Sequence, residues 1–112
     1  MSQQISVSLD ELDFMPTAHA FGLKKILFDG KDTACQLTQF AYGKLGAGES
    51  IPSHQHPTME EYFYFLKGKG TYTISDITID LREGVAVRIP AGSMHILEAE
   101  EDLEFLYFGI AV

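Results

Sequence analysis

From residue 20 onward, the chain consists of short apolar and aromatic runs in which hydrophobic and polar positions tend to alternate. Alternation with a period of two residues predicts strands, and we expect them at residues 21–28, 33–42, 62–67, 71–75, 77–81, 85–89, 95–99 and 103–111. Turn-forming residues separate these runs, at positions 29–30, 43–48, 68–70, 76, 83–84, 91–93 and 100–102. Many short strands without long helical patterns predict an all-β fold, an antiparallel barrel or sandwich.

The first 19 residues differ from this pattern and are expected to form an N-terminal arm, so that residues 20–112 make a single β-domain. The sequence Ser8-Leu-Asp-Glu11 matches a capping box and predicts one helical turn before Pro16. His19 precedes the first clear strand, and we expect it to be a surface histidine.

Three histidines and one glutamate have the spacing of a metal site on a β-sheet. His54 and His56 are two residues apart, and such residues point to the same face of a strand. Pro57 predicts that this strand ends there and that Glu61 returns on the next one. His95 follows a Pro-Ala-Gly turn, where another strand should begin. Three imidazoles and one carboxylate suit one divalent ion such as iron, manganese, nickel, copper or zinc, with coordination positions left open.

The spacing of these residues resembles the two sequence motifs of the cupin family. Nine positions between residues 48 and 95 match: Gly48, His54, His56, Glu61, Gly68, Gly84, Pro90, Gly92 and His95. The resemblance implies a single cupin-type antiparallel β-barrel or jelly roll with the metal held inside by the three histidines and Glu61. Ala99 stands where the second motif has asparagine. Because that asparagine is not a metal ligand in the family, the change concerns the polarity of the pocket.

Strand alternation also predicts which side chains surround the metal. If Glu61 points inward, Phe63 and Phe65 do too, and they form an apolar wall beside the ion. The intervening residues then face outward: Tyr62, Tyr64 and Leu66. An outer face this apolar needs a cover, either the N-terminal arm or a second subunit, and we predict a homodimer.

Several other polar residues are candidates for the pocket. Arg88 would bind a carboxylate or phosphate if it faced inward, but the residues on either side of it are apolar and favour an outward position for Arg88. Gln36 and Gln39 must lie on opposite faces, and the sequence leaves open which of them, or of Tyr42 and Tyr72, lines the pocket. Cys35 is the only cysteine, so no internal disulfide is possible, and we expect a buried, inert thiol.

The charge balance narrows the choice of partners. Sixteen acidic and eight basic side chains give a net charge of -8, which argues against nucleic acid and anionic membranes as partners. A small-molecule ligand or substrate is expected instead, and an anionic one would have to be attracted by the metal or by a local cation. The chain has no signal-peptide pattern and no run of 18 apolar residues, which predicts a cytoplasmic protein.

Three classes of function remain open. The first is a redox-neutral metal-dependent enzyme, an isomerase or lyase, that acts on a small sugar, uronate, or hydroxy or keto acid. The resemblance supports it, since small cupins include isomerases and proteins that act on unsaturated uronates. The second is an iron-dependent dioxygenase, because the same ligand set occurs in dioxygenases of the family. The third is a non-catalytic small-molecule-binding module. We favour the first, and the identity of the metal together with oxygen uptake would separate it from the second.

Overall fold

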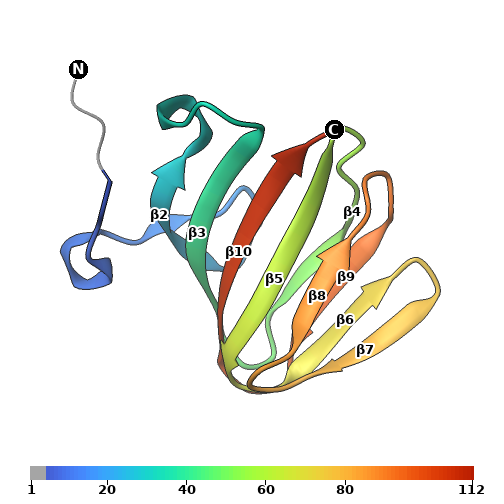
Figure 1. The fold of residues 1–112 in the computed structure, drawn as a ribbon. Coiled ribbons are helices and arrows are strands. Elements are labelled where there is room, and N and C mark those ends of the chain that lie inside the picture. Colours follow the sequence, from blue (N-terminus) through green and yellow to red (C-terminus); the bar gives the residue numbers. More distant parts are fainter. Residues whose placement is uncertain (1–4) are drawn as a thin grey trace.

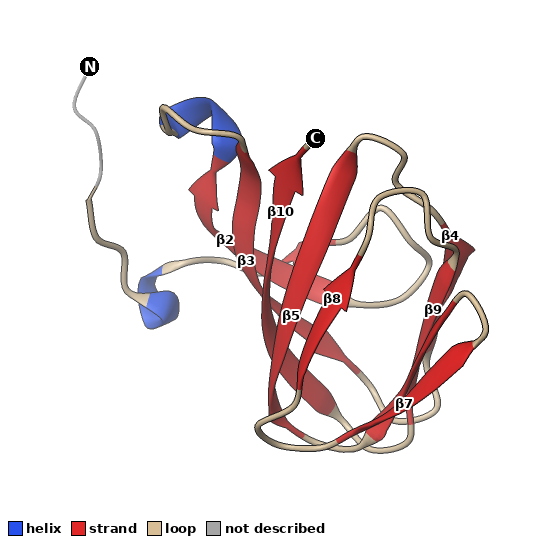
Figure 2. Cartoon of the chain, turned by 45° about the vertical axis from the view of Figure 1, so that its right-hand side comes forward, coloured by secondary structure: helices blue, strands red, loops and turns tan. Residues whose placement is uncertain are grey.

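In the computed structural model, which describes residues 5–112, the chain forms ten strands in two antiparallel sheets (Figure 1). The six-stranded sheet has the order β1 (Met15–Pro16), β2 (Leu23–Asp29), β3 (Leu37–Leu45), β10 (Leu103–Ala111), β5 (Met59–Lys67) and β8 (Ala86–Ile89). The four-stranded sheet has the order β4 (Ser50–His54), β9 (His95–Ala99), β6 (Gly70–Ile74) and β7 (Ile77–Leu81). The sheets form two layers (Figure 2). The predicted all-β fold is confirmed, as a jelly-roll sandwich and not as a closed barrel.

The alternation of residues along β5 sets the inner and outer faces of the larger sheet. Glu61, Phe63 and Phe65 are buried, whereas Tyr64 and Leu66 are exposed, as the period of two predicts. The inner face packs against the smaller sheet through a core of aromatic and aliphatic side chains. The core includes Phe63, Phe65, Tyr72, Leu97 and Phe105. Aromatic side chains contribute large buried areas, and this allows a short chain to stabilise a two-layer fold.

The third strand differs from the prediction at both of its ends. A bend at residues 33–36, which follows the 3-10 helix η2 (Gly30–Asp32), occupies the start of the predicted run, and β3 begins only at Leu37. Gly43, which we expected in a turn, lies inside β3 opposite Phe105, and a Cβ there would lie 2.4 Å from the Phe105 ring. Glycine at this point is therefore a packing requirement and not a turn signal. The turn itself begins at Gly46, whose carbonyl accepts a hydrogen bond from the N–H of Glu49 at 2.9 Å.

The shift at the start of β3 also changes the position of the cysteine. Cys35 lies in the bend before the strand and is exposed, so the prediction of a buried thiol is wrong. The apolar residues around it predicted a strand, but the chain must bend there to return from η2 to the sheet.

The N-terminal arm forms one turn and then joins the larger sheet. The 3-10 helix η1 (Leu9–Glu11) confirms the predicted turn, although the Ser8 hydroxyl donates to the Asp10 side chain and not to a capping partner. Further along, the short strand β1 pairs with β2. Phe14 packs against Tyr42 on the outer face, with a distance of 6.1 Å between the ring centroids. The arm thus covers the outer face at β3 but leaves Tyr64 and Leu66 exposed.

Within residues 5–112, no helix has the length and apolar character that crossing a membrane requires.

Candidate metal centre

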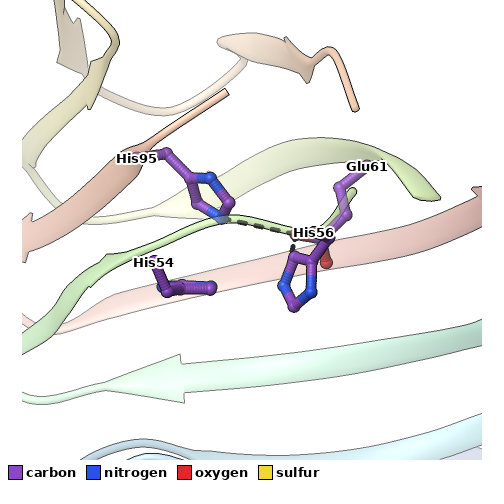
Figure 3. Close-up of side chains that lie close together, drawn as sticks. All are labelled: His54, His56, Glu61 and His95. Carbon is purple, nitrogen blue, oxygen red and sulfur yellow. Dashed lines mark ion pairs between the residues drawn. The ribbon is translucent and has the colours of Figure 1, made fainter. Parts of the chain in front are cut away.

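The four predicted ligands come together between the two sheets (Figure 3). Their candidate ligand atoms all lie within 4.8 Å of one another. His54 ends β4, His95 begins β9, and the two residues are paired across these neighbouring strands. Glu61 comes from β5 of the other sheet. The site therefore depends on the packing of one sheet against the other, and each sheet supplies part of the ligand set.

His56 is not on the strand that carries His54. Strand β4 ends at His54, and His56 lies in the turn that leads to β5, so the expectation of one strand for both is wrong. The turn is held by the carbonyl of His56, which accepts a hydrogen bond from the N–H of Gly92 at 3.0 Å. Gly92 has a φ of +82°, which glycine adopts readily, and it belongs to the turn before His95. This bond joins the turns of the two sequence motifs and brings His56 and His95 to the same side.

Backbone hydrogen bonds orient the rings of His54 and His95. The Nδ1 atom of His54 lies 2.8 Å from the carbonyl of Pro52, and Nδ1 of His95 lies 2.9 Å from the carbonyl of Ser93. Since a carbonyl only accepts, each Nδ1 carries the proton and each Nε2 has a free lone pair. Within the described residues, Nε2 of His95 is fully buried and has no hydrogen-bond partner. A buried polar atom without a partner is costly, and a bound cation would supply the partner.

The spacing of the ligand atoms is also close to that around one bound ion. The Oε1 atom of Glu61 lies 3.4 Å from Nε2 of His56 and 3.6 Å from Nε2 of His95, along the dashed lines in Figure 3. These distances are longer than ordinary hydrogen bonds. Two ligands that each lie about 2.1 Å from one ion are about 3.0–3.4 Å apart. The residues present thus fit a divalent transition metal in donor chemistry, and these two separations lie at or slightly above the range for ligands of one ion.

Burial keeps the imidazole of His54 in the form that binds metals. It lowers the pKa of His54, and the neighbouring imidazoles add to this effect, whereas the hydrogen bond to the Pro52 carbonyl opposes it. A lowered pKa means that His54 is neutral at pH 7, and only a neutral imidazole has a lone pair for a metal.

A cavity of about 160 Å³ adjoins the candidate ligands. Its walls include the rings of Phe63, Tyr72, Phe105 and Tyr107, together with the polar side chain of Gln39. Burial raises the pKa of Tyr72 and of Tyr107, and the charge of Glu61 adds to the effect in both cases. Both hydroxyls therefore stay protonated at neutral pH and are available as hydrogen-bond donors.

The structure also decides which of the other polar candidates reach this cavity. Gln39 and Tyr72 line it, whereas Gln36 is exposed just before β3. Arg88 points outward, as expected from its apolar neighbours, and its Nη1 atom donates to Oε2 of Glu60 at 2.8 Å. Tyr42 lies on the outer face, where its hydroxyl donates to the side chain of Glu104.

Ala99 belongs to the hydrophobic core. It is 6% exposed, and its backbone N–H and carbonyl both bond to the turn before β4. It is absent from the residues that line the cavity within the described chain, so the alanine itself contributes nothing to the cavity walls.

His19 was not predicted as part of this region. The expectation of a surface histidine is wrong, because the arm folds back and places the half-buried His19 ring 4.5 Å from the ring of His54. The Thr17 hydroxyl accepts from the N–H of His19 and donates to the carbonyl of Phe21, which stabilises the bend. Burial is the main cause of a lowered pKa at His19. His19 lies outside the sequence motifs, and no local pattern indicates its position.

Comparison with known proteins agrees with this geometry. The model of the cupin domain matches residues 41–109. Dimethylsulfoniopropionate lyase DddW from Ruegeria pomeroyi is 30% identical over 84 residues, which are 74% of this chain and 55% of the lyase. The chain thus spans about half the length of this curated relative.

Solved structures share the whole fold. A predicted oxalate decarboxylase from Thermotoga maritima matches with a TM-score of 0.83 at 23% identity, over 97% of this chain and 100% of the other. KdgF from Halomonas sp. matches with a TM-score of 0.78 at 21% identity, over 96% and 94%. The polyketide cyclase RemF from Streptomyces resistomycificus matches with a TM-score of 0.80 at 20% identity, over 98% and 80%. From the match over residues 41–109 and this fold, we conclude that the chain belongs to the cupin family.

Proposed function

We propose that this protein is a metal-dependent enzyme that catalyses a redox-neutral reaction, an isomerisation or elimination, on a small sugar, uronate, or hydroxy or keto acid. The observation that carries the proposal is the buried, unpartnered Nε2 atom of His95, which points with His54, His56 and Glu61 to a common centre beside a cavity. A purely structural sandwich needs neither the convergent ligand atoms nor the space beside them.

The residues around the cavity have separate parts in such a reaction. A divalent ion bound by the four ligands would act as a Lewis acid on a substrate oxygen. Tyr72 and Tyr107, which remain protonated, would donate hydrogen bonds or a proton to a substrate oxygen that gains negative charge. Phe63 and Phe105 exclude water from the same space and so strengthen each polar contact there.

The curated relative favours the redox-neutral class. Its name describes a lyase, and an elimination needs no external oxidant. The principal alternative is an iron-dependent dioxygenase, because three imidazoles and one carboxylate also suit iron and leave positions open. A non-catalytic binding protein would use the same cavity without turnover.

The test begins with the metal content of the untagged protein, purified in air and under nitrogen without added metal. We expect about one zinc, nickel or manganese ion per chain. The loaded protein is then incubated under nitrogen with sugars, uronates, and hydroxy and keto acids, and products are followed by NMR. Turnover without oxygen, lost in His56→Ala, is the expected result.

Two results would contradict this proposal. Stoichiometric iron with oxygen uptake during turnover would establish the dioxygenase alternative. A protein that takes up no metal on titration, yet still binds a small molecule, would be the non-catalytic module.

We also propose that the protein is a homodimer joined through the outer face of its larger sheet. An apolar groove on this face is lined by Phe40, Tyr62, Tyr64, Leu106 and Phe108. The N-terminal arm does not cover Tyr64, which is 47% exposed. A second copy of the same face supplies an equally apolar partner, and self-complementary contacts of this kind are the commonest in homodimers.

A further inference from the structure

A lysine lies on the inner face of the larger sheet, next to the candidate metal centre. Lys24 of β2 is paired with Gly43 of β3, and Ile26 is paired with Ala41. Paired residues point to the same side of a sheet, and both Gly43 and Ala41 are buried on the inner side. Lys24 accordingly lines the cavity that also contains His54, His56 and Glu61.

We infer that Lys24 and Gln39 form an anchor for a carboxylate group of the substrate, at the wall of the cavity and apart from the metal ligands. This inference rests on the proposed function and narrows its substrates to short carboxylic acids.

The hydrogen bonding of the pair leaves donors available for such a group. Nζ of Lys24 donates to Oε1 of Gln39 at 3.3 Å, which uses one of the three ammonium protons. Because Oε1 of Gln39 faces the lysine, the amide NH₂ group remains for another acceptor. A carboxylate accepts from an ammonium and an amide at the same time, and hydrogen bonds to a charged group are the stronger kind.

The absence of a counter-ion supports the same conclusion. In residues 5–112, no carboxylate lies within 4.0 Å of the Lys24 ammonium, although the protein has sixteen acidic side chains. Lys24 is half-buried, so its ammonium is partly shielded from water and has no carboxylate partner among the described residues. A bound carboxylate would neutralise it. In a protein with a net charge of -8, this local positive charge is also what an anionic substrate would need at the cavity.

The size of the cavity limits the ligand further. A volume of about 160 Å³ is below the usual range for drug-sized ligands, which begins at about 300 Å³. An acid that spans from Lys24 to the metal ligands must therefore be short, with its carboxylate at one end and an oxygen for the metal at the other.

The neighbouring lysine provides a matched control. Lys25 is paired with Tyr42 on the outer face, and its Nζ donates to the carbonyl of Leu9 at 2.9 Å and lies 4.6 Å from the centre of the Phe14 ring. Both residues belong to β2 and carry the same charge, but only Lys24 lines the cavity.

The experiment measures binding directly by NMR titration of the zinc-loaded protein with lactate and pyruvate, and with the uncharged analogue lactamide. Lys24→Met should weaken the binding of both acids by about 10- to 100-fold, the range for a lost hydrogen bond to a charged group. Lys25→Met should bind them as the wild type does, and Lys24→Arg should retain most of the affinity because it keeps the charge. Lactamide should bind equally weakly to the wild type and to Lys24→Met.

The outcomes separate this inference from the proposed function. If Lys24→Met keeps its zinc and its fold and binds the acids as tightly as the wild type, the anchor is wrong, while the metal-dependent reaction still stands. The anchor is equally wrong if neither acid binds the wild type at millimolar concentration. If the wild type takes up no metal but binds the acids through Lys24, the anchor holds and the proposed reaction fails.

Discussion

At the scale of single residues, a hydrogen bond at one nitrogen of His54 and of His95 decides what the other ring nitrogen can do. The backbone carbonyls of Pro52 and Ser93 hold the Nδ1 protons of His54 and His95, and each Nε2 lone pair is thereby directed to the common centre. Geometry of this kind is set before any ion arrives, so metal binding requires little rearrangement of the protein.

Loss of one imidazole should remove the metal and leave the fold. We expect His56→Ala to bind divalent metal at least about 100-fold more weakly, because even outer-shell partners of metal ligands contribute about 10- to 100-fold. The variant should stay folded, because the core consists of aromatic and aliphatic side chains and His56 lies in a turn. Elemental analysis and circular dichroism are the measurements.

His19 provides the control for this variant. It is a histidine in the same region, but it does not belong to the four residues whose ligand atoms converge within the described chain. His19→Ala should therefore retain the metal content of the wild type. Full metal content in His56→Ala, or its loss in His19→Ala, would show that the centre is misassigned.

The partly buried tyrosine beside the site, Tyr107, should make stability depend on alkaline pH. Burial raises the pKa of Tyr107 above its usual value of 10, with a smaller effect from Glu61. Above pH 10, the Tyr107 hydroxyl loses its proton in the unfolded chain but keeps it in the folded protein. The stabilising contribution is thus complete below pH 10 and is lost as the pH rises through the folded pKa.

This dependence can be measured by urea unfolding at several alkaline pH values. The free energy of unfolding of Tyr107→Phe should fall less steeply with rising pH than that of the wild type, because phenylalanine has no proton to lose. Identical pH dependence in the two proteins would mean that Tyr107 ionises freely in the fold.

At the scale of elements, the motif glycines have different physical reasons for being glycine. Gly68, between β5 and β6, has a φ of +97°, and a Cβ there would lie 2.1 Å from the backbone carbonyl oxygen of Asp102. Gly84, before β8, has a φ of +89° but open space around it. Gly68 is therefore required both for its positive φ and because a side chain would not fit, whereas Gly84 is required only for its positive φ.

Alanine substitutions should separate these two requirements. Gly84→Ala should lower the free energy of unfolding by about 1–2 kcal/mol, the cost of a positive φ in a residue with a Cβ. Gly68→Ala adds a clash with rigid backbone and should cost about 1–3 kcal/mol more. Denaturant unfolding of both variants checks this, and equal losses would contradict the role given to the Asp102 carbonyl.

At the scale of the whole molecule, the larger sheet has one face in the core and one apolar face only partly covered. The arm reaches Tyr42 through Phe14 but leaves the groove around Tyr64 open. Burial of this groove against a second copy is the reason for the proposed homodimer.

The oligomeric state tests that reason directly. Sedimentation or solution scattering at micromolar concentration should give about twice the chain mass of 12.5 kDa. Tyr64→Lys should shift the protein to the monomer by placing a charge in the groove. The control is Ile77→Lys, which alters an exposed apolar residue of the smaller sheet and should remain dimeric. A monomeric wild type would leave the arm as the only cover.

Some features of the structure could be predicted from the sequence better than others. The period of two along β5 correctly placed Glu61, Phe63 and Phe65 on the inner face, since alternation is a property of the strand itself. Motif spacing singled out the four residues whose ligand atoms converge in the structure. The boundaries of β3 were less predictable, because Gly43 has the composition of a turn and only Phe105, far along the chain, explains its place in a strand.

By itself, the sequence determined the fold class and the inward face of β5, which depend on local periodicity, and the four candidate ligands, which follow from the spacing of two sequence motifs. Only the tertiary structure placed His19 against His54, Lys24 beside the cavity and Cys35 at the surface. These positions depend on how the arm folds back, on the pairing of β2 with β3 and on the bend before β3. The first two positions depend on contacts between residues that are distant in the chain, and no local pattern indicates them.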